Sequence, residues 1–194
     1  IAQCLVGSEM CIRDRCVTSA NAVQIVKKLP NQNILFIPDK NLGRYVAEQV
    51  PEKNVMLVKG YCPVHEEMKV KEIQELKQLH PLAEVLAHPE CNASVLSIAD
   101  YIGSTTGILK QAAASNAKEF IIATEIGVRY ELEKQNPKKT FYFPKTEPVC
   151  MDMKKITLDG ILHVLRTGEN GAAVASNIAE PSKATLNRML ELAA

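Results

Sequence analysis

Two short motifs of the sequence bring together side chains that can bind metals and move protons. The motif Gly-Tyr-Cys-Pro-Val-His places the thiol of Cys62 three residues from the imidazole of His65. The motif His-Pro-Glu-Cys places the imidazole of His88 and the carboxylate of Glu90 beside the thiol of Cys91. A lone loop histidine or a lone buried cysteine is usually structural. Thiol, imidazole and carboxylate together are the groups that hold metals and transfer protons, so the two motifs are candidates for one site.

Hydroxyl groups at two predicted helix starts form a second kind of candidate. Ser19 lies in the segment Thr-Ser-Ala-Asn, and Thr105 lies in the segment Ser-Thr-Thr-Gly. The first backbone N–H groups of a helix have no partner within the helix, so such a segment suits a carboxylate or a phosphate. N-capping explains either segment alone, whereas two segments in matched positions favour anion binding.

The elements that must position these residues alternate between strand and helix. Short apolar runs predict strands at 16–18, 34–37, 54–58, 84–87, 101–102 and 119–123. Amphipathic or capped segments predict helices at 20–29, 42–49, 68–79, 93–99, 108–114, 128–134, 158–166 and 178–192. This order predicts an α/β fold whose parallel sheets are buried on both faces. In such sheets ligands bind beyond the C-terminal ends of the strands, and the candidate loops follow predicted strands.

An internal repeat supports this organisation. The segment that starts at Thr18 can be laid on the segment that starts at Ser104, with a spacing of 86 residues. Asp39 then matches Glu125, and Arg44-Tyr45 matches Arg129-Tyr130 if one residue is deleted. We therefore expect two similar α/β domains, at 16–92 and at 93–194 with the C-terminal helices, whose order along the chain can be interleaved.

The composition excludes several classes of protein. The 194 residues carry 23 Lys and Arg against 22 Asp and Glu, a net charge of +1, which argues against nucleic acid as a partner. No apolar run approaches the length that spans a bilayer, so we expect no membrane association. The six cysteines include no Cys-x-x-Cys pair, and no signal peptide is recognisable, so we expect free thiols and a cytoplasmic location.

The first 15 residues do not read as part of a domain. The stretch CLVGSEMCIRDR has no helical or alternating period and resembles a translated sequencing adapter. We interpret residues 1–15 as an artefact, which removes Cys4 and Cys11 from the chemistry.

The ordered set of motifs from Cys16 onward resembles the quinolinate synthase family. The matching segments are TSANAV from Thr18, PDKNL from Pro38, GYCPVH from Gly60, HPEC from His88, GST from Gly103 and CMDMK from Cys150. The resemblance implies three similar three-layer α/β domains around a pseudo-threefold axis, with the active site at their shared centre. This chain would contain two of the three.

The resemblance also implies an activity and a cofactor. It implies condensation of iminoaspartate with dihydroxyacetone phosphate to quinolinate in NAD biosynthesis, with L-aspartate oxidase or dehydrogenase supplying the iminoaspartate. A [4Fe–4S] cluster held by one cysteine per domain would act as a Lewis acid. By motif match, Cys62 and Cys150 are two of its ligands, whereas Cys91 is not in a ligand position.

Further roles follow by motif match. Ser19 and Thr105 would hold carboxylate or phosphate oxygens, and His88, Pro89 and Glu90 would contact the substrate. Glu90 would accept a proton, and His65 would donate or orient one. The family's first domain, with the third cluster cysteine, is missing from this sequence. We therefore expect that the chain alone neither holds a stable cluster nor makes quinolinate.

Two other functions remain open on the residues alone. One is a zinc-dependent hydrolase with Cys62, His65 and His88 as ligands and Glu90 as the base, although no compact motif such as His-Glu-x-x-His is present. The other is a small-anion binding module built on Ser19 and Thr105.

Overall fold

The computed structural model describes residues 15–169, 171 and 173–194. Residues 17–149 form one compact unit, and residues 150–194 belong to a second unit. Most of the stretch interpreted as an artefact, including Cys4 and Cys11, lies outside the described residues.

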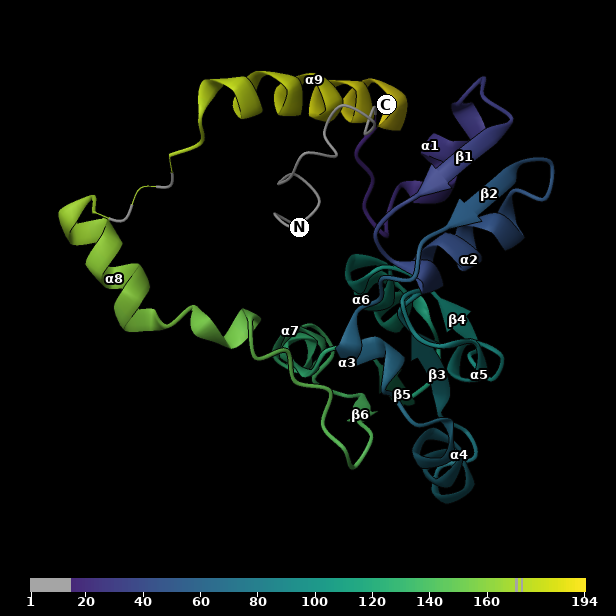
Figure 1. The fold of residues 1–194 in the computed structure, drawn as a ribbon. Coiled ribbons are helices and arrows are strands. Elements are labelled where there is room, and N and C mark those ends of the chain that lie inside the picture. Colours follow the sequence, from purple (N-terminus) through teal and green to yellow (C-terminus); the bar gives the residue numbers. More distant parts are fainter. Residues whose placement is uncertain (1–14, 170, 172) are drawn as a thin grey trace. The chain divides into compact units, whose positions relative to one another are not determined.

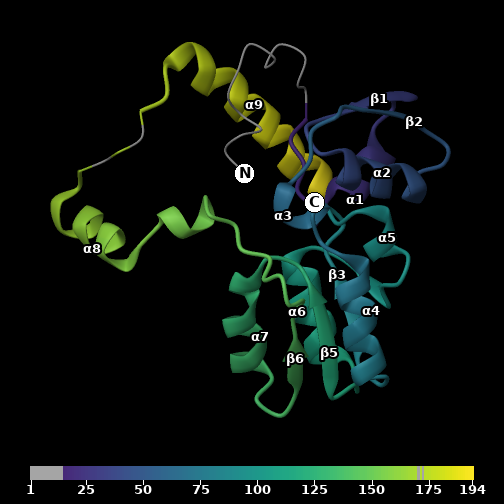
Figure 2. The ribbon, with the colours of Figure 1, turned by 60° about the horizontal axis from the view of Figure 1, so that its bottom comes forward.

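The larger unit holds a four-stranded parallel sheet. Its strands are β3 (Glu84–Ala87), β4 (Tyr101–Ile102), β5 (Glu119–Ala123) and β6 (Thr140–Tyr142), in the order β4-β3-β5-β6. The helices that accompany them are α4 (Val70–Leu79), α5 (Ala93–Leu96), α6 (Thr105–Ala114) and α7 (Arg129–Gln135). Figure 2 shows α6 and α7 on one side of the sheet and α4 and α5 on the other.

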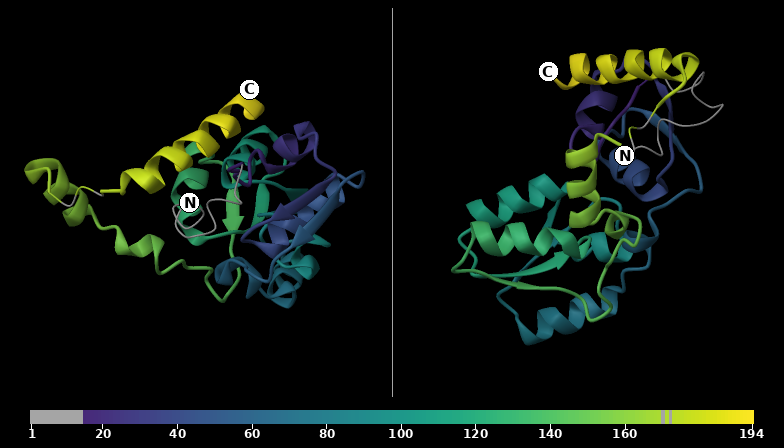
Figure 3. Two further views of the ribbon diagram at one scale, coloured as in Figure 1. Left: turned by 45° about the horizontal axis from the view of Figure 1, so that its top comes forward. Right: turned by 90° about the vertical axis from the view of Figure 1, so that its left-hand side faces the viewer.

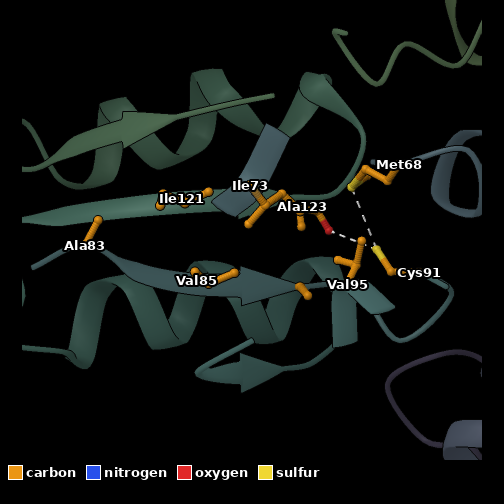
Figure 4. Close-up of a cluster of buried hydrophobic side chains, with 9 residues drawn as sticks. Met68, Ile73, Ala83, Val85, Cys91, Val95, Ile121 and Ala123 are labelled. Carbon is orange, nitrogen blue, oxygen red and sulfur yellow. Dashed lines mark hydrogen bonds between the residues drawn. The ribbon is translucent and has the colours of Figure 1, made fainter. Parts of the chain in front are cut away.

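Apolar side chains cover both faces of this sheet, because successive residues of a strand point to opposite sides. On one face, Val85 and Ile121 pack with Ile73 of α4 and Val95 of α5 (Figure 4). On the other face, the buried cluster contains Leu86, Ile108, Ala112, Phe120, Ile122, Val128 and Leu132. The result is a three-layer α/β/α arrangement, in which the strand layer lies between two helical layers (Figure 3, right). The prediction of an α/β fold with parallel sheets is confirmed.

A second, two-stranded parallel sheet differs in how it is covered. It consists of β1 (Asn33–Phe36) and β2 (Asn54–Leu57) and packs against α1 (Ala22–Lys28) and α2 (Lys40–Gln49) (Figure 1). The prediction that β1 is buried on both faces is wrong. Phe36 is buried against α2, but Leu35 on the opposite face is 51% exposed.

The internal repeat is visible in hydrogen bonds. Asn54 N donates to Gln32 O, and Thr140 N donates to Lys118 O, which keeps the spacing of 86 residues. Lys53 and Lys139, also 86 residues apart, each donate from Nζ to the carbonyl of a helix C-cap, Leu29 after α1 and Ser115 after α6. The spacing of 86 residues is therefore found again after Arg44, and the match of Arg44-Tyr45 to Arg129-Tyr130 with one residue deleted stays a prediction.

Several local predictions need correction. Residues 16–18 form no strand. The sequence also gave no indication of α3 (Pro63–Glu66), β6, or the short 3-10 helices η3 (Ile126–Val128) and η4 (Met153–Lys155). The C-terminal helices are α8 (Leu158–Thr167) and α9 (Ser176–Ala193), close to the predicted bounds. The boundary expected between two domains at residues 92 and 93 stays a prediction. Strand β3 precedes this point and β5 follows it, and the two strands pair in one sheet.

None of the helices in the described ranges is long and apolar enough to cross a membrane.

Candidate functional site

The loop that carries Cys62 is held by the carboxylate of Asp39. Oδ1 of Asp39 accepts from the backbone N–H groups of Asn41 and Leu42, at 2.9 and 2.7 Å, and so caps α2. Oδ2 of the same buried carboxylate accepts from the backbone N–H of Cys62 at 2.8 Å. One side chain therefore fixes both the start of α2 and the position of the thiol.

His65 is the centre of the site. It is buried on α3, and its Nδ1 lies 3.2 Å from Sγ of Cys62 and 3.4 Å from Oε2 of Glu90. Its Nε2 lies 3.1 Å from Oγ1 of Thr124, the residue that follows β5. The two motifs predicted to form one site therefore meet at this imidazole.

Charge separation within this group favours a protonated His65. Burial lowers the pKa of His65, but hydrogen bonds and charge attraction from Cys62 and Glu90 outweigh it and raise the pKa to about 9. Burial raises the pKa of Glu90, but its hydrogen bond with His65 and the positive charge of that imidazolium help to bring it below the usual value. At neutral pH, Glu90 is therefore a carboxylate beside an imidazolium.

His88 has the opposite electrostatic character. Its ring stacks on that of His65, with 4.6 Å between ring centroids. Burial, followed by the positive charge of His65, lowers the pKa of His88 to about 4. The backbone N–H of Glu90 donates to Nδ1 of His88 at 3.3 Å, so the neutral ring carries its proton on Nε2. Nε2 lies 3.2 Å from Oγ of Ser19, which accepts from it.

Three residues that support the site were not identified as site residues from the sequence. They are Asp39, Asn41 and Thr124. Asn41 Nδ2 donates to the backbone carbonyl of Glu90 at 3.0 Å and to Oε2 of Glu66 at 2.7 Å, which ties α2 to the Glu90 loop. A usable signal was present, because Asp39 follows β1 and Thr124 follows β5, at the strand ends where ligands bind.

The hydroxyl segments at the helix starts differ from their predicted roles. Ser19 was predicted as an N-cap, but α1 begins three residues later and its N-cap is Asn21. At α6 the N-cap is Ser104, whose Oγ accepts from Gly107 N, and Thr105 is the exposed first residue of the helix. The Ser19 hydroxyl thus contacts the His88 ring, whereas Thr105 lies in the first turn of α6. Pro89, between His88 and Glu90 in the sequence, is buried.

The thiol of Cys91 belongs to the hydrophobic core. It is fully buried and donates to the carbonyl of Ala123 at 3.3 Å, with Sδ of Met68 at 3.9 Å (Figure 4). Burial raises the pKa of Cys91 to about 12. It is therefore a protonated core thiol at neutral pH.

Cys150 occupies the position in the second repeat that Cys62 occupies in the first. Lys40 N donates to Gly60 O at 2.7 Å, two residues before Cys62. Ile126 N donates to Pro148 O at 2.9 Å, two residues before Cys150. After each cysteine the chain turns in the same way, because its carbonyl accepts from the N–H four residues later. Neither cysteine forms a disulfide with another described residue.

Ligand atoms from Cys62, His65 and Glu90 all lie within 4.8 Å of one another. This set differs from the one predicted for zinc, which had His88 as the third ligand and Glu90 as the base. Nδ1 of His88 accepts a backbone N–H, and its Nε2 points to Ser19.

Comparison with known proteins identifies close relatives. Residues 5–191 match the family model described as "Quinolinate synthetase A protein". The chain is 44% identical over 193 residues to the quinolinate synthase of Clostridioides difficile, covering 98% of this chain and 64% of that protein. It is 45% identical over 184 residues to the quinolinate synthase of Aquifex aeolicus, covering 92% and 57%. The chain thus spans about three fifths of the length of these relatives. The matched range includes residues 5–15, whose interpretation as an artefact stays a prediction.

Proposed function

Because the chain belongs to the quinolinate synthase family, we propose that it forms part of an enzyme that condenses iminoaspartate with dihydroxyacetone phosphate to quinolinate, a step of NAD biosynthesis. The observation that carries the proposal is the convergence of Ser19, Cys62, His65, His88 and Glu90 from separate segments of the chain. These are residues that the family motifs assign to the site.

The repeat supports a three-domain architecture for the whole enzyme. Each repeat ends on a cysteine in the same backbone setting, Cys62 in one and Cys150 in the other. We infer that these are two of three similar α/β domains, and that the rest of the longer protein supplies the third. In a pseudo-threefold arrangement, equivalent cysteines would approach a common axis.

The donor set fits a [4Fe–4S] cluster at two of its ligand positions. Cys62 and Cys150 would hold the cluster, because both are incompletely buried thiols at equivalent turns. Cys91 does not fit, because its thiol is buried and engaged in the core. When bound, the cluster would supply a Lewis acid for a substrate hydroxyl that leaves as water. A third thiolate has to come from beyond the two repeats, so this chain alone would not hold a stable cluster.

Glu90 and His65 would carry the proton transfers. The Glu90 carboxylate is ionised at neutral pH, and it would accept a proton from a carbon or nitrogen acid of the substrate. His65 is protonated and lies between a thiol and a carboxylate, so it would donate a proton to a leaving hydroxyl. Contact between the two groups would allow the proton to pass back from Glu90 to His65.

Ser19 and His88 would bind a substrate anion. Oγ of Ser19 accepts from Nε2–H of neutral His88, so the Ser19 hydroxyl proton points elsewhere and would donate to a carboxylate or phosphate oxygen. Thr105, at the first turn of α6, would hold a second oxygen through its hydroxyl and the helix N-terminus. Pro89 would line the substrate pocket. Its ring would also restrict the backbone between His88 and Glu90.

The chemistry of the substrate implies the partners. Iminoaspartate hydrolyses readily in water, so an enzyme that oxidises L-aspartate, an oxidase or a dehydrogenase, would supply it. The four cysteines of the described residues form no disulfide with one another, which suits a reducing cytoplasm, and we propose this location.

A chimera tests this function. Residues 16–194 would be fused to the part of the Clostridioides difficile quinolinate synthase that this chain does not match. After anaerobic reconstitution with iron and sulfide, we expect about four irons per chain and quinolinate formation from iminoaspartate and dihydroxyacetone phosphate.

Three cysteine variants of the chimera serve as matched tests. Cys62→Ser and Cys150→Ser should each abolish the visible absorbance of the cluster and the activity, whereas Cys91→Ser should retain both. A folded chimera that holds the cluster but makes no quinolinate would refute the proposed activity. A full cluster in Cys150→Ser would refute the equivalence of the two repeats.

A further inference from the structure

We propose that Sγ of Cys62, Nδ1 of His65 and the carboxylate of Glu90 form a binding site for a single zinc-like divalent cation, independent of Cys150. The site goes beyond the proposed function, because it holds one ion rather than a cluster and needs only the unit formed by residues 17–149. It rests on where three ligand atoms of different chemistry lie in that unit.

The distances already approach those around a tetrahedral ion. Nδ1 of His65 is 3.2 Å from Sγ of Cys62 and 3.4 Å from Oε2 of Glu90, and all three ligand atoms lie within 4.8 Å of one another. For metal–ligand bonds of about 2.0–2.3 Å, tetrahedral ligands are separated by about 3.4–3.6 Å. A small rotation of the Glu90 side chain would therefore complete three of four positions, and water would take the fourth.

Neighbouring residues orient the ligands as they do in protein zinc sites. When Nδ1 binds a metal, Nε2 carries the proton and donates to Oγ1 of Thr124, at 3.1 Å. The Cys62 backbone is fixed by Asp39, and the Glu90 backbone carbonyl is fixed by Asn41. Each of the three ligands is therefore supported by a polar contact outside the set.

The ligand types select the ion. A thiolate, an imidazole and a carboxylate suit Zn²⁺ or Co²⁺, whereas Mg²⁺ and Ca²⁺ prefer oxygen ligands alone. His65 is buried and Glu90 is half-buried, so the set is not a chance group of exposed acids. Since one thiolate cannot serve both roles here, an ion at this site would keep Cys62 from binding a cluster.

Cobalt titration of the 194-residue chain tests the site. A background with Cys4→Ser and Cys11→Ser removes two thiols that are not part of the proposal. Co²⁺ should bind at one equivalent, with a sulfur-to-cobalt charge-transfer band in the near ultraviolet and intense visible bands of a tetrahedral ion. Zn²⁺ should displace it, and Mg²⁺ at a hundredfold excess should not.

Variants at the ligands and at matched positions decide between outcomes. Cys62→Ser should remove the charge-transfer band, and His65→Gln and Glu90→Gln should each weaken binding by about a hundredfold or more. Thr124→Val should weaken it by about tenfold, because only the orientation of His65 is lost. Cys150→Ser, at the equivalent position of the other repeat, should bind Co²⁺ like the background.

Circular dichroism of each variant shows whether it is folded. Full binding in a folded His65→Gln or Glu90→Gln variant would overturn the proposal, as would loss of binding in a folded Cys150→Ser variant. A second experiment measures directly whether the ion occupies the Cys62 thiolate. One equivalent of Zn²⁺ should slow alkylation of Cys62, identified by peptide mass, by at least about tenfold. An unchanged alkylation rate would also overturn it. Neither test depends on quinolinate formation, so the proposed function could fail while the ion site stands.

Discussion

The two repeats share a backbone arrangement but differ in what they bury and in what they carry. In both, a strand, a helix and a second strand lead to a cysteine, with hydrogen bonds at matching positions. In the first repeat Cys62 is followed three residues later by buried His65, whereas Cys150 is followed at that distance by exposed Met153. In the second repeat, strand β5 is buried on both faces, whereas β1 of the first repeat is buried on one. We conclude that the repeated part places a thiol in each copy, whereas a buried imidazole three residues after the thiol is found in the first copy alone.

The largest difference should appear in catalysis. In the reconstituted chimera, His65→Gln removes the group that would donate a proton, and we expect kcat to fall by about 10²–10⁴-fold. Met153→Gln changes the equivalent position, and we expect kcat to stay within about threefold. Quinolinate formation by liquid chromatography, normalised to cluster content, measures both. Equal losses in the two variants would mean that the repeats do not differ in this way.

Core packing should separate the repeats next. Ile121 in β5 is fully buried, whereas Leu35, its counterpart in β1, is 51% exposed. Ile121→Ala removes buried methyl groups and leaves a cavity, so it should lower the free energy of unfolding by about 2–5 kcal/mol. Leu35→Ala should lower it by less than about 1 kcal/mol, since its side chain is half in water. Urea unfolding followed by circular dichroism measures both, and a loss for Leu35→Ala as large as that for Ile121→Ala would show that β1 is covered in solution.

The two histidines of the first repeat should titrate far apart. In the metal-free chain we expect NMR titration to give a pKa of about 9 for His65 and about 4 for His88. Because the folded state raises the pKa of His65, its contribution to stability is complete below pH 6.5 and is lost as the pH rises through 9. Because the folded state lowers the pKa of His88, its contribution is present above pH 6.5 and is lost as the pH falls through 4.

A substitution of His65 tests the alkaline part of this pH dependence. His65→Gln should abolish the alkaline decrease in stability between pH 6.5 and 9 that Met153→Gln leaves in place. A His65 that titrates near 6.5 would show that its contacts with Cys62 and Glu90 do not persist in solution.

The sequence predicts strands better than it predicts what covers them. The bounds of β3, β4 and β5 agree with the structure, because each is a short apolar run between turn residues. The exposure of Leu35 could not be predicted, because an apolar run in a parallel sheet does not say which faces find a partner.

The residues of the candidate site could be singled out from the sequence, but the residues that support them could not. The candidate site residues stand out because their side-chain types are chemically distinctive and lie close together within each of two motifs, Cys62 with His65 and His88 with Glu90. Thr124 is 59 residues from the imidazole that it contacts, and its one local signal is that it directly follows an apolar strand. The pairing of β5 with β3 brings Thr124 to the same end of the sheet as His88, whose ring stacks on that of His65. The geometry that orients His65 is therefore a product of topology rather than of any motif.

The smallest expected effect concerns a lysine that binds a helix end in each repeat, and its loss should cost the same in both. Lys53 donates from Nζ to the carbonyl of Leu29, at the end of α1, and Lys139 donates to the carbonyl of Ser115, at the end of α6. Each ammonium satisfies a carbonyl that lacks a helical partner, and it lies near the negative end of the helix dipole. Lys53→Met and Lys139→Met should each lower the free energy of unfolding by about 0.5–1.5 kcal/mol, measured by urea unfolding. Similar losses would show that this contact belongs to the shared arrangement, whereas a loss confined to Lys139→Met would show that the first repeat no longer depends on it.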